Sequence, residues 1–77
     1  MTMILFDFVT NEIIEFDNKQ ETQIINNKHQ LYKDRINLVF GRDYLCGVYV
    51  WFIKTIDDDT ITRLSLEQKV SQFLRDN

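Results

Sequence analysis

An unbroken apolar run from Val48 to Ile53 constrains the fold of this chain more than any other feature. A strand with one face in water alternates apolar and polar residues, but this run is apolar at every position. It therefore predicts a β-strand with two apolar faces, and each of these faces needs a cover. One face would carry Val48, Val50 and Phe52, and the other would carry Tyr49, Trp51 and Ile53.

The size and composition of the chain predict a small globular protein. Of its 77 residues, 44% are hydrophobic and 13% are aromatic, so a single domain over residues 1–77 is expected. The only cysteine, Cys46, has no partner for an internal disulfide and borders the apolar run, where burial is expected. The N-terminus lacks the basic start of a signal peptide, and no segment approaches the roughly 18 apolar residues of a membrane span. These features predict a cytoplasmic protein without a membrane segment.

Alternating residues predict most of the strands. The N-terminal residues alternate in the manner of strands on either side of a short polar break, which predicts a β-hairpin over residues 3–16. Further strands are expected at residues 36–40, 44–56 and 60–64, with a turn at residues 41–43. The expected sheet therefore has four or five strands and is antiparallel.

The segment over residues 17–35 carries two conflicting signals. The side chains of Ile25, His29, Tyr32 and Ile36 have helical spacing, but the pair Asn26-Asn27 favours a turn over a helix interior. The preferred interpretation is a short strand near residues 23–25, a turn at the asparagines and irregular chain beyond.

The C-terminal segment has the clearest helical pattern. Ser65 with Gln68 resembles a capping box, which predicts a helix over residues 65–75. A helix this short is unstable alone, so it should dock on the sheet, over the face of Val48, Val50 and Phe52. The expected fold class is α+β, with one C-terminal helix against the sheet. The apolar stripe of this helix comprises Leu66, Val70, Phe73 and Leu74.

A single helix leaves the second face of the long strand uncovered. Residues 17–35 could fold over that face, or the sheet could close into a barrel. Otherwise a partner or a second copy of the chain would cover it. Tyrosine and tryptophan favour the external solution slightly, because both residue types are enriched at binding hot spots.

No residue pattern predicts catalysis, a cofactor or a metal site. His29 and Cys46 lack a third group that would orient them as a catalytic pair, and they are too few for a zinc site. The two glycines do not form a phosphate-binding loop, and neither serine lies in a nucleophile motif. The acidic run Asp57, Asp58 and Asp59 lacks the spacing of a calcium loop. The chain is therefore expected not to be an enzyme.

The favoured functional hypothesis is a small acidic protein-binding module. With a net charge of −3, it would inhibit or modulate a larger and basic partner, such as a nucleic-acid-handling protein, by occluding its surface. Apolar anchors would insert into the partner, and an acidic rim would speed association. The expected anchors are Tyr49, Trp51 and Ile53, and the expected rim is Asp57, Asp58 and Asp59.

Two alternatives use the same aromatic face. In the first, Tyr49 and Trp51 stack the bases of a single-stranded nucleic acid, although the net negative charge of the chain opposes this. The basic residues of that interface would be Arg35, Arg42 and Lys54. In the second, two copies of the chain join through the face as a homodimer.

Overall fold

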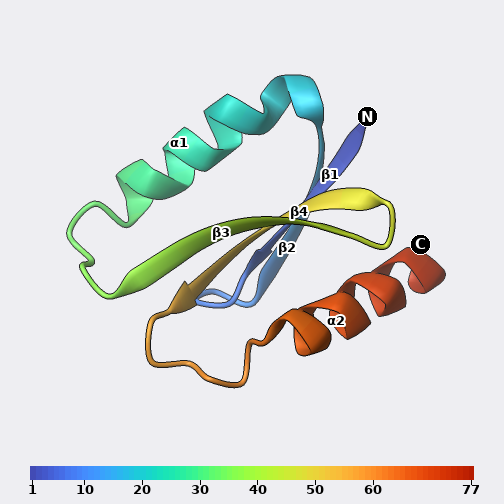
Figure 1. Ribbon diagram of the computed structural model, residues 1–77. Coiled ribbons are helices and arrows are strands. Elements are labelled where there is room, and N and C mark those ends of the chain that lie inside the picture. Colours follow the sequence, from blue (N-terminus) through green and yellow to red (C-terminus); the bar gives the residue numbers. More distant parts are fainter.

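The computed structural model describes all residues 1–77 and shows a sheet between two helices (Figure 1). The α+β class, the N-terminal hairpin and the C-terminal helix are confirmed, and a second helix covers the opposite face of the sheet. The elements in chain order are β1 (Thr2–Asp7), β2 (Glu12–Asp17), the 3-10 turn η1 (Asn18–Gln20), α1 (Glu21–Leu31), β3 (Leu38–Leu45), β4 (Val48–Thr55) and α2 (Arg63–Asp76).

The sheet has four strands in the order β2-β1-β4-β3 and is mixed, whereas the sequence predicted an antiparallel sheet. Each hairpin is antiparallel, but the two central strands are parallel, with Leu5 of β1 opposite Trp51 of β4. The physical reason is α1, which carries the chain from the β2 edge to the β3 edge (Figure 1). The second hairpin therefore returns with β4 beside β1 and in the same direction.

Within residues 17–35, the 3-10 turn η1 leads into α1 over residues 21–31, so the strand expected near residues 23–25 and the turn expected at the asparagines were wrong. Asp17 accepts a hydrogen bond from the Lys19 amide, and the Gln20 side chain accepts one from the Asp17 amide, which closes a capping box. Asn26 and Asn27 are both exposed on α1. Their weak turn preference is overridden because the helix buries apolar area against the sheet.

The turn between β3 and β4 lies at Cys46 and Gly47 and not at residues 41–43. Both turn residues have positive φ, 54° and 82°, as a type I′ hairpin requires. Gly41 lies inside β3 opposite Phe52, and a Cβ atom there would meet the Phe52 ring. Cys46 is exposed at the turn, so the prediction that its thiol is buried was wrong.

The C-terminal helix begins two residues earlier than predicted. Thr62 is the N-cap and forms a capping box with Ser65, so Ser65 is not the cap and residues 60–64 do not form a strand. Leu66 and Val70 of α2 are buried against Val50, as the apolar stripe predicted. Leu74 is 38% exposed and lies at the margin of this contact.

Two apolar clusters fill the spaces on the two sides of the sheet. The cluster under α2 confirms that the face of Val48, Val50 and Phe52 packs against the C-terminal helix. The cluster under α1 contains the fully buried Ile53, with Tyr49 and Trp51 partly buried at its margin. The expectation that this face lacks a cover within the chain was therefore wrong for most of its length, because α1 lies over it.

Candidate functional site

The structure separates the residues that the sequence analysis grouped as one binding site. Ile53 has no exposed surface, so its side chain is not on the outside of the protein. Tyr49 and Trp51 are half-buried near the start of β4. The acidic run, Asp57 to Asp59, follows the other end of that strand, and the strand from residue 49 to residue 55 spans roughly 20 Å.

The exposed parts of Tyr49 and Trp51 belong to a patch that also includes two residues of β3. In the β3–β4 register, Tyr44 lies opposite Tyr49 and Arg42 lies opposite Trp51, which places all four side chains on the α1 face. The Tyr44 and Tyr49 rings meet edge to face at 4.9 Å between centroids. The Arg42 guanidinium lies 4.3 Å from the Tyr49 ring centroid. We call Arg42, Tyr44, Tyr49 and Trp51 the aromatic corner.

Glu21, the first residue of α1, holds two members of the aromatic corner. Its Oε2 atom accepts hydrogen bonds from Trp51 Nε1 and from Arg42 Nε, each at 2.7 Å. The Trp51 bond is the largest influence on this carboxyl group and, with Arg42, holds the pKa of Glu21 below its ordinary value. A carboxylate is also favourable at the N-terminus of a helix. The corner is therefore ordered by one side chain from α1.

The sequence did not predict Tyr44 as part of a binding surface or the hydrogen bonds of Glu21 to Trp51 and Arg42, and Arg42 was considered only as a contact to nucleic acid. The expected turn at residues 41–43 placed Arg42 in a loop, which concealed its pairing with Trp51. The signal that could have found these pairs is the Cys46–Gly47 dipeptide, because a two-residue turn sets the register of both strands.

The acidic run forms a turn that satisfies its own hydrogen bonds. Asp58 accepts hydrogen bonds from the Thr60 hydroxyl and amide, which hold the pKa of Asp58 below its ordinary value. Lys54 Nζ donates to the Asp58 backbone carbonyl at 3.1 Å. Asp57 and Asp59 are exposed. The run is thus a separate charged surface at the far end of β4.

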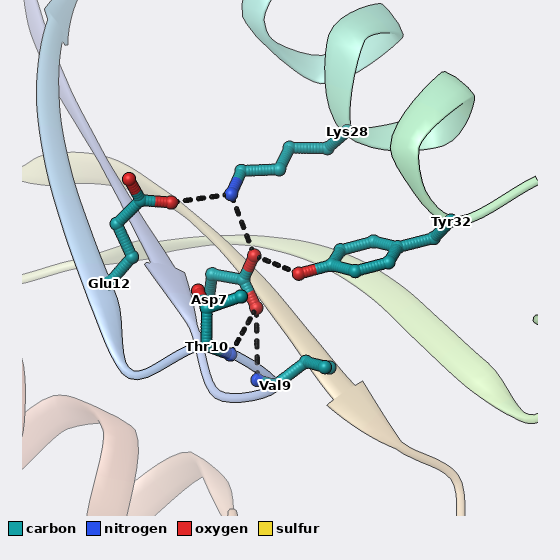
Figure 2. Close-up of polar contacts among 6 residues, drawn as sticks. All are labelled: Asp7, Val9, Thr10, Glu12, Lys28 and Tyr32. Carbon is teal, nitrogen blue, oxygen red and sulfur yellow. Dashed lines mark hydrogen bonds and ion pairs between the residues drawn. The ribbon is translucent and has the colours of Figure 1, made fainter.

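A second polar cluster, buried between α1 and the sheet, was not anticipated (Figure 2). Asp7, at the end of β1, is 1% exposed, and its Oδ2 atom accepts hydrogen bonds from Lys28 Nζ at 2.7 Å and from Tyr32 Oη at 2.6 Å. Its Oδ1 atom accepts from the amides of Val9 and Thr10. Lys28 also donates to Glu12, at 2.6 Å, at the margin of the cluster.

The charges of this buried cluster compensate one another. Burial, the largest influence, would raise the pKa of Asp7, but hydrogen bonds from Lys28, Tyr32 and the two turn amides together lower it. Burial would likewise lower the pKa of Lys28, but its bonds to Asp7 and Glu12 raise it. Burial and the bond to Asp7 raise the pKa of Tyr32. No buried side-chain polar atom lacks a hydrogen-bond partner. Because Lys28 of α1 donates to Asp7 and Glu12, the cluster ties α1 to the β1–β2 hairpin.

The residues considered for chemistry at the sequence level lie apart in the structure. His29 stacks on Phe40 with 4.0 Å between ring centroids, whereas the Cys46 thiol approaches the Glu67 backbone carbonyl at 3.8 Å. No group of three or more His, Cys, Asp or Glu side chains is arranged to hold a metal ion. Neither α1 nor α2 has the length and apolar character of a membrane-crossing helix.

The three basic residues of the nucleic-acid alternative do not form one surface. Arg42 is paired with Glu21, Lys54 lies on the α2 face of β4, and Arg35 lies in the connection between α1 and β3. Comparisons of the chain with protein-family models, curated proteins and solved structures found no significant match.

Proposed function

We propose that this protein is a non-enzymatic protein-binding module whose contact surface is centred on the aromatic corner. The observation that supports this proposal is the gathering of two tyrosines, a tryptophan and an arginine on one partly exposed patch. Tyrosine, tryptophan and arginine are the residue types most enriched among binding hot spots. Tyr44 is 54% exposed and is the most accessible aromatic ring of this patch.

The order of the aromatic corner also favours binding. Glu21 fixes Trp51 and Arg42, and the Arg42 guanidinium lies over the Tyr49 ring, so little side-chain freedom remains to be lost when a partner docks. A chain of this size would act by occluding or modulating a surface of a larger partner. The acidic run, Asp57, Asp58 and Asp59, would act separately, by attracting a positively charged partner over a longer range.

The proposal is tested by affinity capture with two variants of matched exposure. Tyr44→Ser removes the outermost ring of the corner, and Leu31→Ser changes a side chain that is 63% exposed at the far end of α1. We expect a protein that the wild type and Leu31→Ser enrich equally and that Tyr44→Ser loses. Equal enrichment by all three proteins, or no enriched protein, would contradict the proposal.

The acidic run is tested with a third variant, in which Asp57, Asp58 and Asp59 are all changed to Asn. We expect slower association with the captured protein at low ionic strength and a smaller difference at high salt. Identical association rates would remove the acidic run from the proposal. Light scattering of the isolated protein tests self-association. A dimer mass for the wild type that falls to a monomer mass in Tyr44→Ser would show that the aromatic corner joins two copies of the chain.

A further inference from the structure

The guanidinium group of Arg42 is held in one orientation with its outer end free. Its Nε atom donates to Glu21 at 2.7 Å, and its Cζ atom lies over the Tyr49 ring, 4.3 Å from the ring centroid. The two terminal Nη groups make no hydrogen bond within the protein, and the side chain is 40% exposed. An oriented arginine with free Nη groups matches the two oxygens of a carboxylate.

Arg42 also lies on the outer strand of the sheet. β3 pairs only with β4, so its other edge is free. The Asn37 carbonyl accepts the Ile56 amide at 2.8 Å, which shows that odd-numbered residues of this strand direct their backbone groups toward β4. The backbone groups of Phe40 and Arg42 consequently point outward from the sheet. They can pair with an additional strand.

Asp43 limits where such a strand can pair. Its carboxylate accepts the Tyr44 amide at 2.8 Å and lies 3.4 Å from Arg63 of α2. The outward amide of Tyr44 is therefore already bonded, whereas those of Phe40 and Arg42 are free. An added strand would pair along the first part of β3, up to Arg42, with the Tyr44 ring beside its end.

We propose that the free edge of β3 binds an extended segment of a partner protein, with an aspartate or glutamate of that segment bound by Arg42. This inference rests on the proposed protein-binding function and names the chemistry of the partner. In an added strand, the residue opposite Arg42 has its side chain on the same face, with the Cβ atoms about 5 Å apart. Its carboxylate then reaches the free Nη groups, while backbone hydrogen bonds hold the segment.

The test is selection of a random peptide library against the immobilised wild-type protein. We expect the enriched peptides to share an Asp or Glu at one position within an otherwise extended, β-branched sequence. Arg42→Gln should weaken their binding about tenfold or more, because hydrogen bonds to charged groups contribute that much. Arg35→Gln, which removes the same charge from an exposed residue of the α1–β3 connection, should change binding little. Enriched peptides without a shared acidic position, or equal binding by Arg42→Gln, would overturn the proposal.

Amide hydrogen exchange gives a second readout that does not depend on the variants. Binding of a selected peptide should slow exchange at the Phe40 and Arg42 amides, while the Gly41 and Asp43 amides, which face β4, should change little. Unchanged exchange at Phe40 and Arg42 would exclude an added strand. If single-stranded oligothymidylate at low salt binds with the same dependence on Arg42, the anion is a phosphate and the proposal fails.

The two proposals fail in different ways. Loss of a captured partner on Tyr44→Ser, with no effect of Arg42→Gln, would leave the protein-binding function in place and remove only the carboxylate contact. Far-UV circular dichroism and thermal unfolding of each variant establish that it remains folded. Arg42→Lys, which keeps the charge but not the paired Nη groups, should bind the selected peptides with intermediate affinity.

Discussion

The ammonium group of Lys28 lies 2.7 Å from the carboxylate of Asp7, in the layer between α1 and the sheet (Figure 2). The Asp7 side chain is fully buried and that of Lys28 is 10% exposed. Removing one charge of such a pair leaves the other in a medium of low polarity, which costs more than the pair itself contributes. The contact is therefore a sensitive point for the stability of the fold.

Changing Lys28 to Met should destabilise the protein by about 3 kcal/mol, since Asp7 would keep only the bonds from Tyr32 and the turn amides. Urea denaturation followed by circular dichroism measures the change in the free energy of unfolding. Lys33→Met, at an exposed residue just beyond α1, is the matched control and should change that free energy by less than about 0.5 kcal/mol. Equal losses in the two variants would show that the buried pair contributes nothing specific.

The stability of the protein should fall in acid because of Asp7. Its folded-state pKa lies below the ordinary value of 3.8, so the unfolded chain binds the proton more readily. The contribution of Asp7 is complete above about pH 5 and is lost as the pH falls through 3.8 toward the folded-state pKa. Urea denaturation at several pH values between 3 and 7 checks this. Asp7→Asn should reduce the loss of unfolding free energy at acid pH. An unchanged loss would show that other groups cause it.

The stability of the protein should also fall at high pH, because two groups of the same cluster have raised pKa values, whereas that of Asp7 is lowered. The pKa of Tyr32 is raised from 10.0 and that of Lys28 from 10.5, so the folded state keeps both protons longer than the unfolded chain does. Their contributions are present below pH 10 and are lost as the pH rises through the folded-state values. Tyr32→Phe should reduce the alkaline loss measured by denaturation between pH 8 and 11. An alkaline limb identical to that of the wild type would contradict this.

The only tryptophan, Trp51, should report the protonation of Glu21. Its indole N–H donates to the Glu21 carboxylate, and the pKa of Glu21 is lowered from 4.5. Acidification should therefore change the Trp51 emission with a midpoint below pH 4.5, before global unfolding. Glu21→Gln should abolish this transition, while Glu67→Gln, at an exposed residue of α2, should retain it. A transition that persists in Glu21→Gln would assign it to another carboxyl group.

Cys46→Asn should stabilise the β3–β4 hairpin. Cys46 has a φ of 54°, and asparagine adopts positive φ more readily than cysteine does. We expect a gain of about 0.5–1 kcal/mol in the free energy of unfolding, measured by thermal or urea denaturation. Cys46→Val, with a branched side chain at the same exposed turn, should lose stability. The opposite order of the two variants would show that backbone conformation does not limit this turn.

The sequence predicted secondary structure correctly where the apolar residues of a segment follow one clear spacing, either helical or strand-like. Leu66 and Val70 recur at helical spacing, and the face of Val50 was correctly assigned to the α2 side. The prediction failed where weak local preferences opposed long-range packing. Asn26 and Asn27 favour a turn by less than α1 gains by burying Ile25 against the sheet. A glycine inside β3 resembled a turn because its partner, the Phe52 ring, lies in another strand.

The candidate site was predictable only in part, for the same reason. Tyr49 and Trp51 were identified from the apolar run. Their partners on β3 were not, because the expected turn at residues 41–43 implied a different β3–β4 register. Ile53 carries the same apolar signal as Trp51, yet it is fully buried, whereas Trp51 lies at the margin of α1. Exposure along a single strand face depends on where the covering helix ends, and the strand itself does not encode that.

The sequence by itself determined which side chains share a face, because strand and helix periods place apolar groups at fixed spacings that must be buried. Only the tertiary structure decided what covers each face and which charges meet. Lys28 reaches Asp7, and Glu21 reaches Arg42, because α1 crosses the sheet from one edge to the other. That crossing results from contacts between residues distant in the chain, and a local sequence pattern does not reveal such contacts.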